Sequence, residues 1–277
     1  HEGRNRFAGA RCRRIGGFFG LGFSSQQSLP RSIGLVVGLI VAGLAVRFFL
    51  AGGIEEYFNP QKRVENQIEA ALKANPGDLA LMEAIETHFP LQYDKMLDRL
   101  GDAAIQAEDE ETLLLVINNV LQEFMASHRN DFAYAPTQNL RSVLADEEAL
   151  VDLLSRENPT MCSDYLFGRI EVTDETSQEL RTLFGKSVAS RVEAMATGRR
   201  DQQMRLAVTP SLVAKLRQSM VQEGASEAQL AMLFDQGDPG VLSSAQQCEA
   251  LQKLHAAVGK MPDEDAALLI GTLLNAA

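Results

Sequence analysis

Three histidines in the acidic part of the chain, His88, His128 and His255, are the side chains best suited to metal binding or proton transfer near neutral pH. Zinc ligands on one helix usually form a close pair, as in the HExxH motif, and no two of these histidines have such a spacing. The sequence also lacks a CxxC pair. We therefore predict no metal site.

Two acidic runs are the remaining candidates for acid–base chemistry: EDEE at 108–111 and DEE at 146–148. Carboxylates brought together in the fold can act as an acid and a base. Both runs fall at predicted helix starts, where carboxylates in solvent complement the helix dipole, and we predict this second role. His255 lies near the apolar face of its predicted helix, which favours a partly buried, hydrogen-bonded side chain over a ligand.

Other catalytic signatures are missing from the sequence. It contains no GxSxG elbow, Walker loop or GxGxxG motif, which are typical of acyl transfer, nucleotide hydrolysis and dinucleotide chemistry. We therefore predict no cofactor and assign no catalytic residue, and a binding role is favoured over an enzymatic one. The alternative is a membrane-anchored hydrolase that uses carboxylates or a lone histidine.

Cys162 and Cys248 are a candidate disulfide pair, because each lies on the apolar side of its predicted helix. An even number of cysteines in an oxidising compartment is typical of disulfide bonding. The bond would close a loop of about 86 residues and stabilise the domain by about 4 to 5 kcal/mol in the chain-entropy model. The alternative is that both cysteines are buried as small apolar side chains and never meet.

The first predicted element along the chain is a helix in an apolar run at 32–54, SIGLVVGLIVAGLAVRFFLAGGI. A helix over 33–54 would be about 33 Å long, enough to cross a bilayer. Arg47 lies past the middle, where its long side chain can reach the headgroups. The same interface is predicted to hold the aromatic residues Phe48, Phe49, Tyr57 and Phe58. The pattern favours an uncleaved span over a cleaved signal or a buried core helix.

Small residues recur every four positions on one face of the predicted span, at Gly34, Gly38 and Ala42. Such faces let two helix backbones approach closely in lipid. We therefore expect the span to pair with a second copy of itself, although glycine and alanine are also common in spans that do not associate.

Charge is divided sharply along the chain. Residues 1–50 contain seven arginines and one acidic residue, a net charge of +6, and the remainder has a net charge of −17. The positive-inside rule places the basic tail, 1–32, in the cytoplasm and residues 55–277 in the periplasm, or in the intermembrane space of a mitochondrion. Because an acidic surface repels phosphates, we do not expect the large domain to bind nucleic acid.

Beyond the span, the sequence predicts an all-α domain of nine or ten helices, with an exposed loop at 196–203 as the predicted internal boundary. The apolar stretch at 113–125 is expected at its centre. The predicted helix starts are Asn59-Pro60, Asn75-Pro76, Asn158-Pro159 and Thr209-Pro210, the predicted ends are Gly168, Gly198 and Gly224, and the capping-box spacings are Ser226–Gln229 and Ser244–Gln247. One predicted inner stripe contains Leu140, Val143, Leu144, Val151 and Leu154.

These features favour one function over others. An anchor, an acidic helical surface and the missing catalytic motifs together indicate a membrane-anchored scaffold, assembly factor or accessory subunit that binds another envelope protein.

Overall fold

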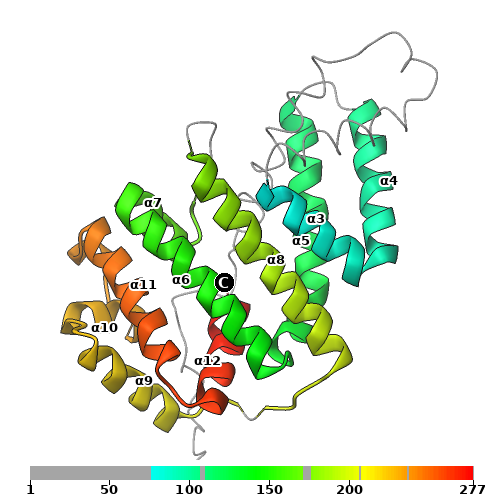
Figure 1. The fold of residues 1–277 in the computed structure, drawn as a ribbon. Coiled ribbons are helices and arrows are strands. Elements are labelled where there is room, and N and C mark those ends of the chain that lie inside the picture. Colours follow the sequence, from blue (N-terminus) through cyan, green and yellow to red (C-terminus); the bar gives the residue numbers. More distant parts are fainter. Residues whose placement is uncertain (1–75, 107–109, 171–175, 206, 236, 277) are drawn as a thin grey trace, which may run out of the picture.

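The computed structural model describes residues 76–106, 110–170, 176–205, 207–235 and 237–276. Within these ranges the chain is all-α and contains no strand, as predicted (Figure 1). The described α-helices are α3 (Pro76–His88), α4 (Pro90–Gln106), α5 (Glu110–Ala133), α6 (Thr137–Glu157), α7 (Pro159–Leu166), α8 (Gln178–Arg200), α9 (Pro210–Gln222), α10 (Glu227–Phe234), α11 (Ser244–Gly259) and α12 (Asp263–Ala276), with a short 3₁₀ helix, η2 (Pro239–Val241), before α11.

Local signals set several helix ends as the sequence predicts. The side chain of Asn158 accepts a hydrogen bond from the backbone N–H of Met161 at 3.0 Å and caps α7. Thr209 caps α9 in the same way. After α7 and α9 the chain turns at Gly168 and Gly224, whose φ angles of 67° and 82° lie in the left-handed region. These predicted starts and ends are confirmed.

One of the two predicted capping boxes is shifted by one residue. Ser226 and Gln229 form the predicted box at the start of α10. At α11 the box is formed by Ser243 with Gln246, so the prediction of Ser244 with Gln247 is wrong. With Ser243 as the cap, Gln247 turns into the interior, where it is buried.

Gly198 does not end its helix, contrary to the prediction, because α8 continues to Arg200. The glycine is required by packing instead. A Cβ atom at this position would lie 1.9 Å from the carbonyl oxygen of Asp131 on α5. The missing side chain lets the two helices approach closely.

Helix α8 has the central place that the sequence analysis assigned to the apolar stretch of α5. It packs against α3, α5 and α6 (Figure 1). On the other side of α6, helix α11 packs against α7, α9, α10 and α12. Helix α4 contacts α3 and α5 and forms an outer edge of this arrangement (Figure 1).

One continuous apolar core runs through these helices, from Leu81 on α3 to Ile270 on α12. The apolar stretch at 113–125 contributes at least four buried residues of α5, Ile117, Val120, Leu121 and Phe124. The loop after α8 is held to the body by Arg205, whose guanidinium donates to the carbonyl oxygens of Ala133 at 3.0 Å and Ala135 at 2.6 Å.

The predicted membrane segment lies outside the described residues. This holds for the basic tail at 1–32, the span at 33–54 and the residues Gly34, Gly38, Ala42, Arg47, Phe48, Phe49, Tyr57 and Phe58. In the part of the chain that the structure describes, no helix is both long enough and apolar enough to cross a membrane.

Candidate functional site

A buried carboxylate lies between α6, α7 and α8 at Glu147, which is 1 % exposed. Its Oε1 atom accepts hydrogen bonds from Arg191 on α8, at 3.0 Å from Nε and 2.7 Å from Nη2. The Ser187 hydroxyl donates to the same oxygen, and the Tyr165 hydroxyl on α7 donates to Oε2. We call Glu147, Tyr165, Ser187 and Arg191 the charged centre.

The charged centre holds Glu147 ionised. Burial by itself would raise the pKa of this carboxyl, but the charge of Arg191 and the hydrogen bonds from Ser187 and Tyr165 outweigh burial and lower the pKa below its ordinary value. Burial would lower the pKa of Arg191, and Glu147 raises it above its usual range. Both partners are therefore charged in the interior, and the opposite charge of each offsets the cost of burying the other.

Tyr165 and His255 stay neutral beside this ion pair. Burial, followed by the charge of Glu147, raises the pKa of the Tyr165 hydroxyl well above its ordinary value. Burial lowers the pKa of His255 on α11, against the attraction of Glu147. The Nδ1 atom of His255 is buried without a hydrogen-bond partner. This side chain is buried as predicted, but its hydrogen bonds are not fully satisfied.

The charged centre has a structural role: it joins α6, α7 and α8 through buried hydrogen bonds and an ion pair. Both carboxylate oxygens of Glu147 accept hydrogen bonds, and its paired guanidinium keeps it from taking up a proton near neutral pH. A general base needs the opposite, a pKa close to the working pH. Glu147 instead joins three helices at a fixed register.

This site is not predicted from the sequence, where the DEE run is expected at a helix start in solvent. The run lies in the middle of α6, and Glu147 is buried. A signal was present in the spacing. The predicted inner stripe of α6 skips one turn between Leu144 and Val151, and Glu147 occupies that turn on the same face. Of the EDEE run, the structure describes only the backbone of the last two residues, in the first turn of α5.

Cys162 and Cys248 meet between α7 and α11, at disulfide distance. Their Cα atoms are 5.4 Å apart, and both residues are completely buried. Beside them, the Ser163 hydroxyl donates to Oε1 of Gln247. The Nε2 atom of Gln247 donates to the carbonyl oxygens of Pro239 at 2.7 Å and Leu242 at 3.0 Å. The two predicted cysteines are thus together, with a polar pair next to them.

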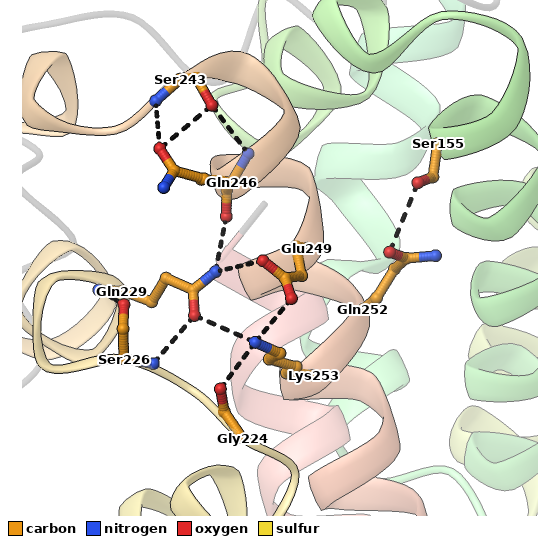
Figure 2. A network of polar contacts seen from close by, with 9 residues as sticks. All are labelled: Ser155, Gly224, Ser226, Gln229, Ser243, Gln246, Glu249, Gln252 and Lys253. Carbon is orange, nitrogen blue, oxygen red and sulfur yellow. Dashed lines mark hydrogen bonds and ion pairs between the residues drawn. The ribbon is translucent and has the colours of Figure 1, made fainter.

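A second polar network joins α10 to α11 near the surface (Figure 2). Gln229 of the α10 capping box donates through Nε2 to the carbonyl oxygen of Gln246 at 2.9 Å and to Glu249 at 3.1 Å. Lys253 pairs with Glu249 at 2.8 Å and donates to the carbonyl oxygen of Gly224 at 2.7 Å. This network joins α10 and the turn after α9 to α11 through side-chain hydrogen bonds.

The other two histidines have different surroundings. His88 is exposed at the end of α3. The ring of His128 lies against Phe89, with centroids 4.4 Å apart, and its Nδ1 atom is 3.0 Å from Oδ2 of Asp131. The described residues contain no group of three or more histidine, cysteine or acidic side chains suited to a metal ion.

The outward face of α4 carries a row of carboxylates. Asp94, Asp98 and Asp102 are spaced four residues apart, so they lie on one face, and all three are exposed. Leu91, one turn before Asp94, is 72 % exposed. Arg99 turns toward α5 and pairs with Glu123 at 2.5 Å. We call Leu91, Asp94, Asp98 and Asp102 the α4 face.

Negative charge is concentrated in this part of the sequence. Residues 76–133 contain twelve acidic and three basic residues, a net charge of −9. The much longer stretch at 134–277 contains twenty acidic and thirteen basic residues, a net charge of −7. The α4 face therefore belongs to the shorter and more acidic part of the domain.

Comparisons of the chain with protein-family models, with curated proteins and with solved structures find no match.

Proposed function

We propose that this chain is a single-pass membrane protein whose acidic helical domain binds another envelope protein, as a scaffold, assembly factor or accessory subunit. The apolar run at 33–54 and the change of net charge from +6 before residue 51 to −17 after it support the anchor and its orientation. The basic tail stays in the cytoplasm, and the helical domain is exported.

The observation that carries the binding role is the α4 face. Its three aspartates are exposed, and the apolar, exposed Leu91 lies one turn before the first of them. A partner with a basic, partly apolar surface would complement this pattern of charge. Complementary charge speeds the encounter of two proteins and selects the correct partner, while an apolar side chain at the contact adds affinity.

The interior supports the same role, because it fixes the shape of the domain. The charged centre joins α6, α7 and α8 through paired polar groups, and the core is continuous from α3 to α12. A rigid helical surface loses little conformational entropy on binding. The domain is thus suited to present a preformed face.

Co-purification of the full chain in mild detergent tests the binding role. The test variant changes Asp94, Asp98 and Asp102 to asparagine. The control variant changes Glu193, Glu227 and Glu264 to glutamine, which removes the same charge from exposed sites elsewhere. We expect a stoichiometric partner to be lost with the test variant, kept with the control and weakened by salt. Equal recovery with both variants would exclude the α4 face as the binding surface.

Self-association of the span is a separate part of the proposal, carried by Gly34, Gly38 and Ala42. Replacing Gly38 by isoleucine puts a large side chain on the small-residue face, and we expect crosslinking of the full chain in membranes to yield less dimer. Replacing Val37 by isoleucine, off that face, is the control. An unchanged dimer yield with Gly38→Ile would show that this face is not an interface.

A further inference from the structure

Helix α7 is short and is fastened to α11 at two successive positions. Cys162 faces Cys248, with Cα atoms 5.4 Å apart, and the next pair, Ser163 and Gln247, is hydrogen-bonded between side chains. Residue numbers rise along α7 as they fall along α11, so the two contacts are neighbouring steps of one antiparallel interface. The covalent and the polar contact therefore hold the same side of α7.

A third contact ties α7 to the charged centre. The Tyr165 hydroxyl donates to Glu147 on α6, and its ring packs against Phe184 on α8 with centroids 5.9 Å apart. Helix α7 thus links the cysteine pair at one of its contacts to the buried ion pair at another. A displacement of α7 would remove one hydrogen bond from a buried carboxylate.

The cysteine pair is buried at the interface between α7 and α11. Both cysteines are 0 % exposed, while Pro159 and Thr160 at the start of α7 lie at the surface. α7 packs against α6 and α11 at the edge of the molecule (Figure 1). Because both sulfurs are buried, a thiol reagent reaches them through transient local opening of this interface, and breaking the S–S bond then removes the covalent link that returns α7 to its closed position.

Eight residues form a helix too short to be stable alone, since isolated helices shorter than about 12 residues are marginal in water. Without a covalent link, α7 depends on the Ser163 and Tyr165 hydrogen bonds and on its apolar contacts. Local opening in proteins occurs in such small cooperative units, at a lower free energy than global unfolding.

We propose that Cys162 and Cys248 form a redox latch on α7: the disulfide holds α7 closed over the charged centre, and its reduction lets α7 open while the rest of the domain stays folded. An external dithiol supplies two electrons and two protons, the S–S bond breaks to give two thiols, and the dithiol closes to its own disulfide. This device does not depend on the membrane anchor or on the α4 face.

Hydrogen exchange on the full chain in detergent tests the latch. The protein carries Cys12→Ser, so that the pair holds its only cysteines, and it is compared before and after reduction with dithiothreitol. We expect reduction to speed exchange of the amides of residues 160–166 on the order of tenfold more than exchange of residues 184–195 of α8, which reports any loss of global stability. Equal exchange in both states would overturn the latch, and so would the same increase in α7 and α8, which would show that the bond stabilises the domain only as a whole.

Two further measurements keep the test decisive. Mass spectrometry of unreduced, alkylated protein from its native compartment must show an intact bond, and labelling of both thiols would refute the proposal. NMR of ring-labelled tyrosine follows the charged centre directly, with the Tyr165 signal assigned by Tyr165→Phe. Reduction should shift that signal and leave those of Tyr93 and Tyr134 in place. An unshifted Tyr165 signal would overturn the coupling.

Discussion

Removing the negative charge of Glu147 would leave the guanidinium of Arg191 buried without its partner. We expect Glu147→Gln to lower the free energy of unfolding by about 3 to 5 kcal/mol, the usual cost of breaking a buried ion pair from one side. Urea denaturation measures this loss. Glu193→Gln, at an exposed site on α8, is the control and should change stability by less than about 0.5 kcal/mol.

A double variant separates the ion pair from its packing. With both Glu147 and Arg191 changed to methionine, no unpaired charge remains, and we expect stability closer to that of the unmodified domain than Glu147→Gln shows. If Glu147→Gln unfolds at the same urea concentration as Glu193→Gln, the pair contributes nothing to stability.

Acid should destabilise the domain through His255 first. Burial lowers the pKa of this ring below its ordinary value of 6.5, so the unfolded chain takes up a proton at a higher pH than the folded chain. The stability that neutral His255 contributes is complete above pH 6.5 and is lost as the pH falls through 6.5 toward the folded pKa. The charged groups that act on it are Glu147 and Arg191 of the charged centre and Asp152 on α6.

Glu147 adds a second loss at lower pH, because its own pKa is lowered from 4.5 and its ionised form stabilises the folded state above that value. We expect urea midpoints to fall in two stages on acidification. His255→Leu should remove the first stage and leave the second, while His88→Gln, at an exposed site, should change neither. A first stage that persists in His255→Leu would contradict the assignment.

At the scale of helices, close approach sets the contact between α8 and α5. Glycine to alanine inside a helix usually adds up to about 1 kcal/mol of stability. At Gly198 the new Cβ would overlap the backbone of Asp131, so we expect Gly198→Ala to destabilise by about 1 to 3 kcal/mol. Gly271→Ala on α12, where the nearest atom is 3.4 Å away, is the control and should be neutral or stabilising in thermal unfolding.

The two capping boxes should differ in what their glutamines contribute. Gln229 and Gln246 occupy the same box position in α10 and α11, but Gln229 is buried and also contacts Gln246 and Glu249 (Figure 2). We expect Gln229→Ala to cost about 1 to 2 kcal/mol more than Gln246→Ala in chemical denaturation, since it also removes the hydrogen bonds from the buried Gln229 side chain to α11. Equal losses would show that only the local box matters.

At the scale of the whole molecule, the division of charge predicts membrane topology. A reporter enzyme that works only outside the cytoplasm should be active when fused after Ala277 and inactive when fused at Gln27. Measured in bacterial cells, the reverse pattern would contradict the orientation and the oxidising compartment together. Activity at both sites would argue against a membrane span.

Short-range signals in the sequence were sufficient for the fold class and for many helix boundaries. A cap such as Asn158 or Thr209 acts on backbone groups three residues away, and Gly168 or Gly224 needs only its own freedom to reach positive φ. The pairing of Cys162 with Cys248 could also be predicted from the sequence, because two apolar helix faces that each carry one cysteine tend to meet in the core. Periodicity and composition contain this information without any knowledge of the tertiary contacts.

Only the tertiary structure decided the role of Glu147. A carboxylate in an apolar helical pattern is either exposed, in which case the predicted apolar face is misplaced, or buried with a charged partner. At Glu147 the partner is Arg191, which is 44 residues away in sequence. The same applies to Gly198, whose constraint comes from a backbone oxygen of another helix. Caps and turns are settled within a few residues, whereas burial of a charge and close helix contact depend on partners that only folding brings near.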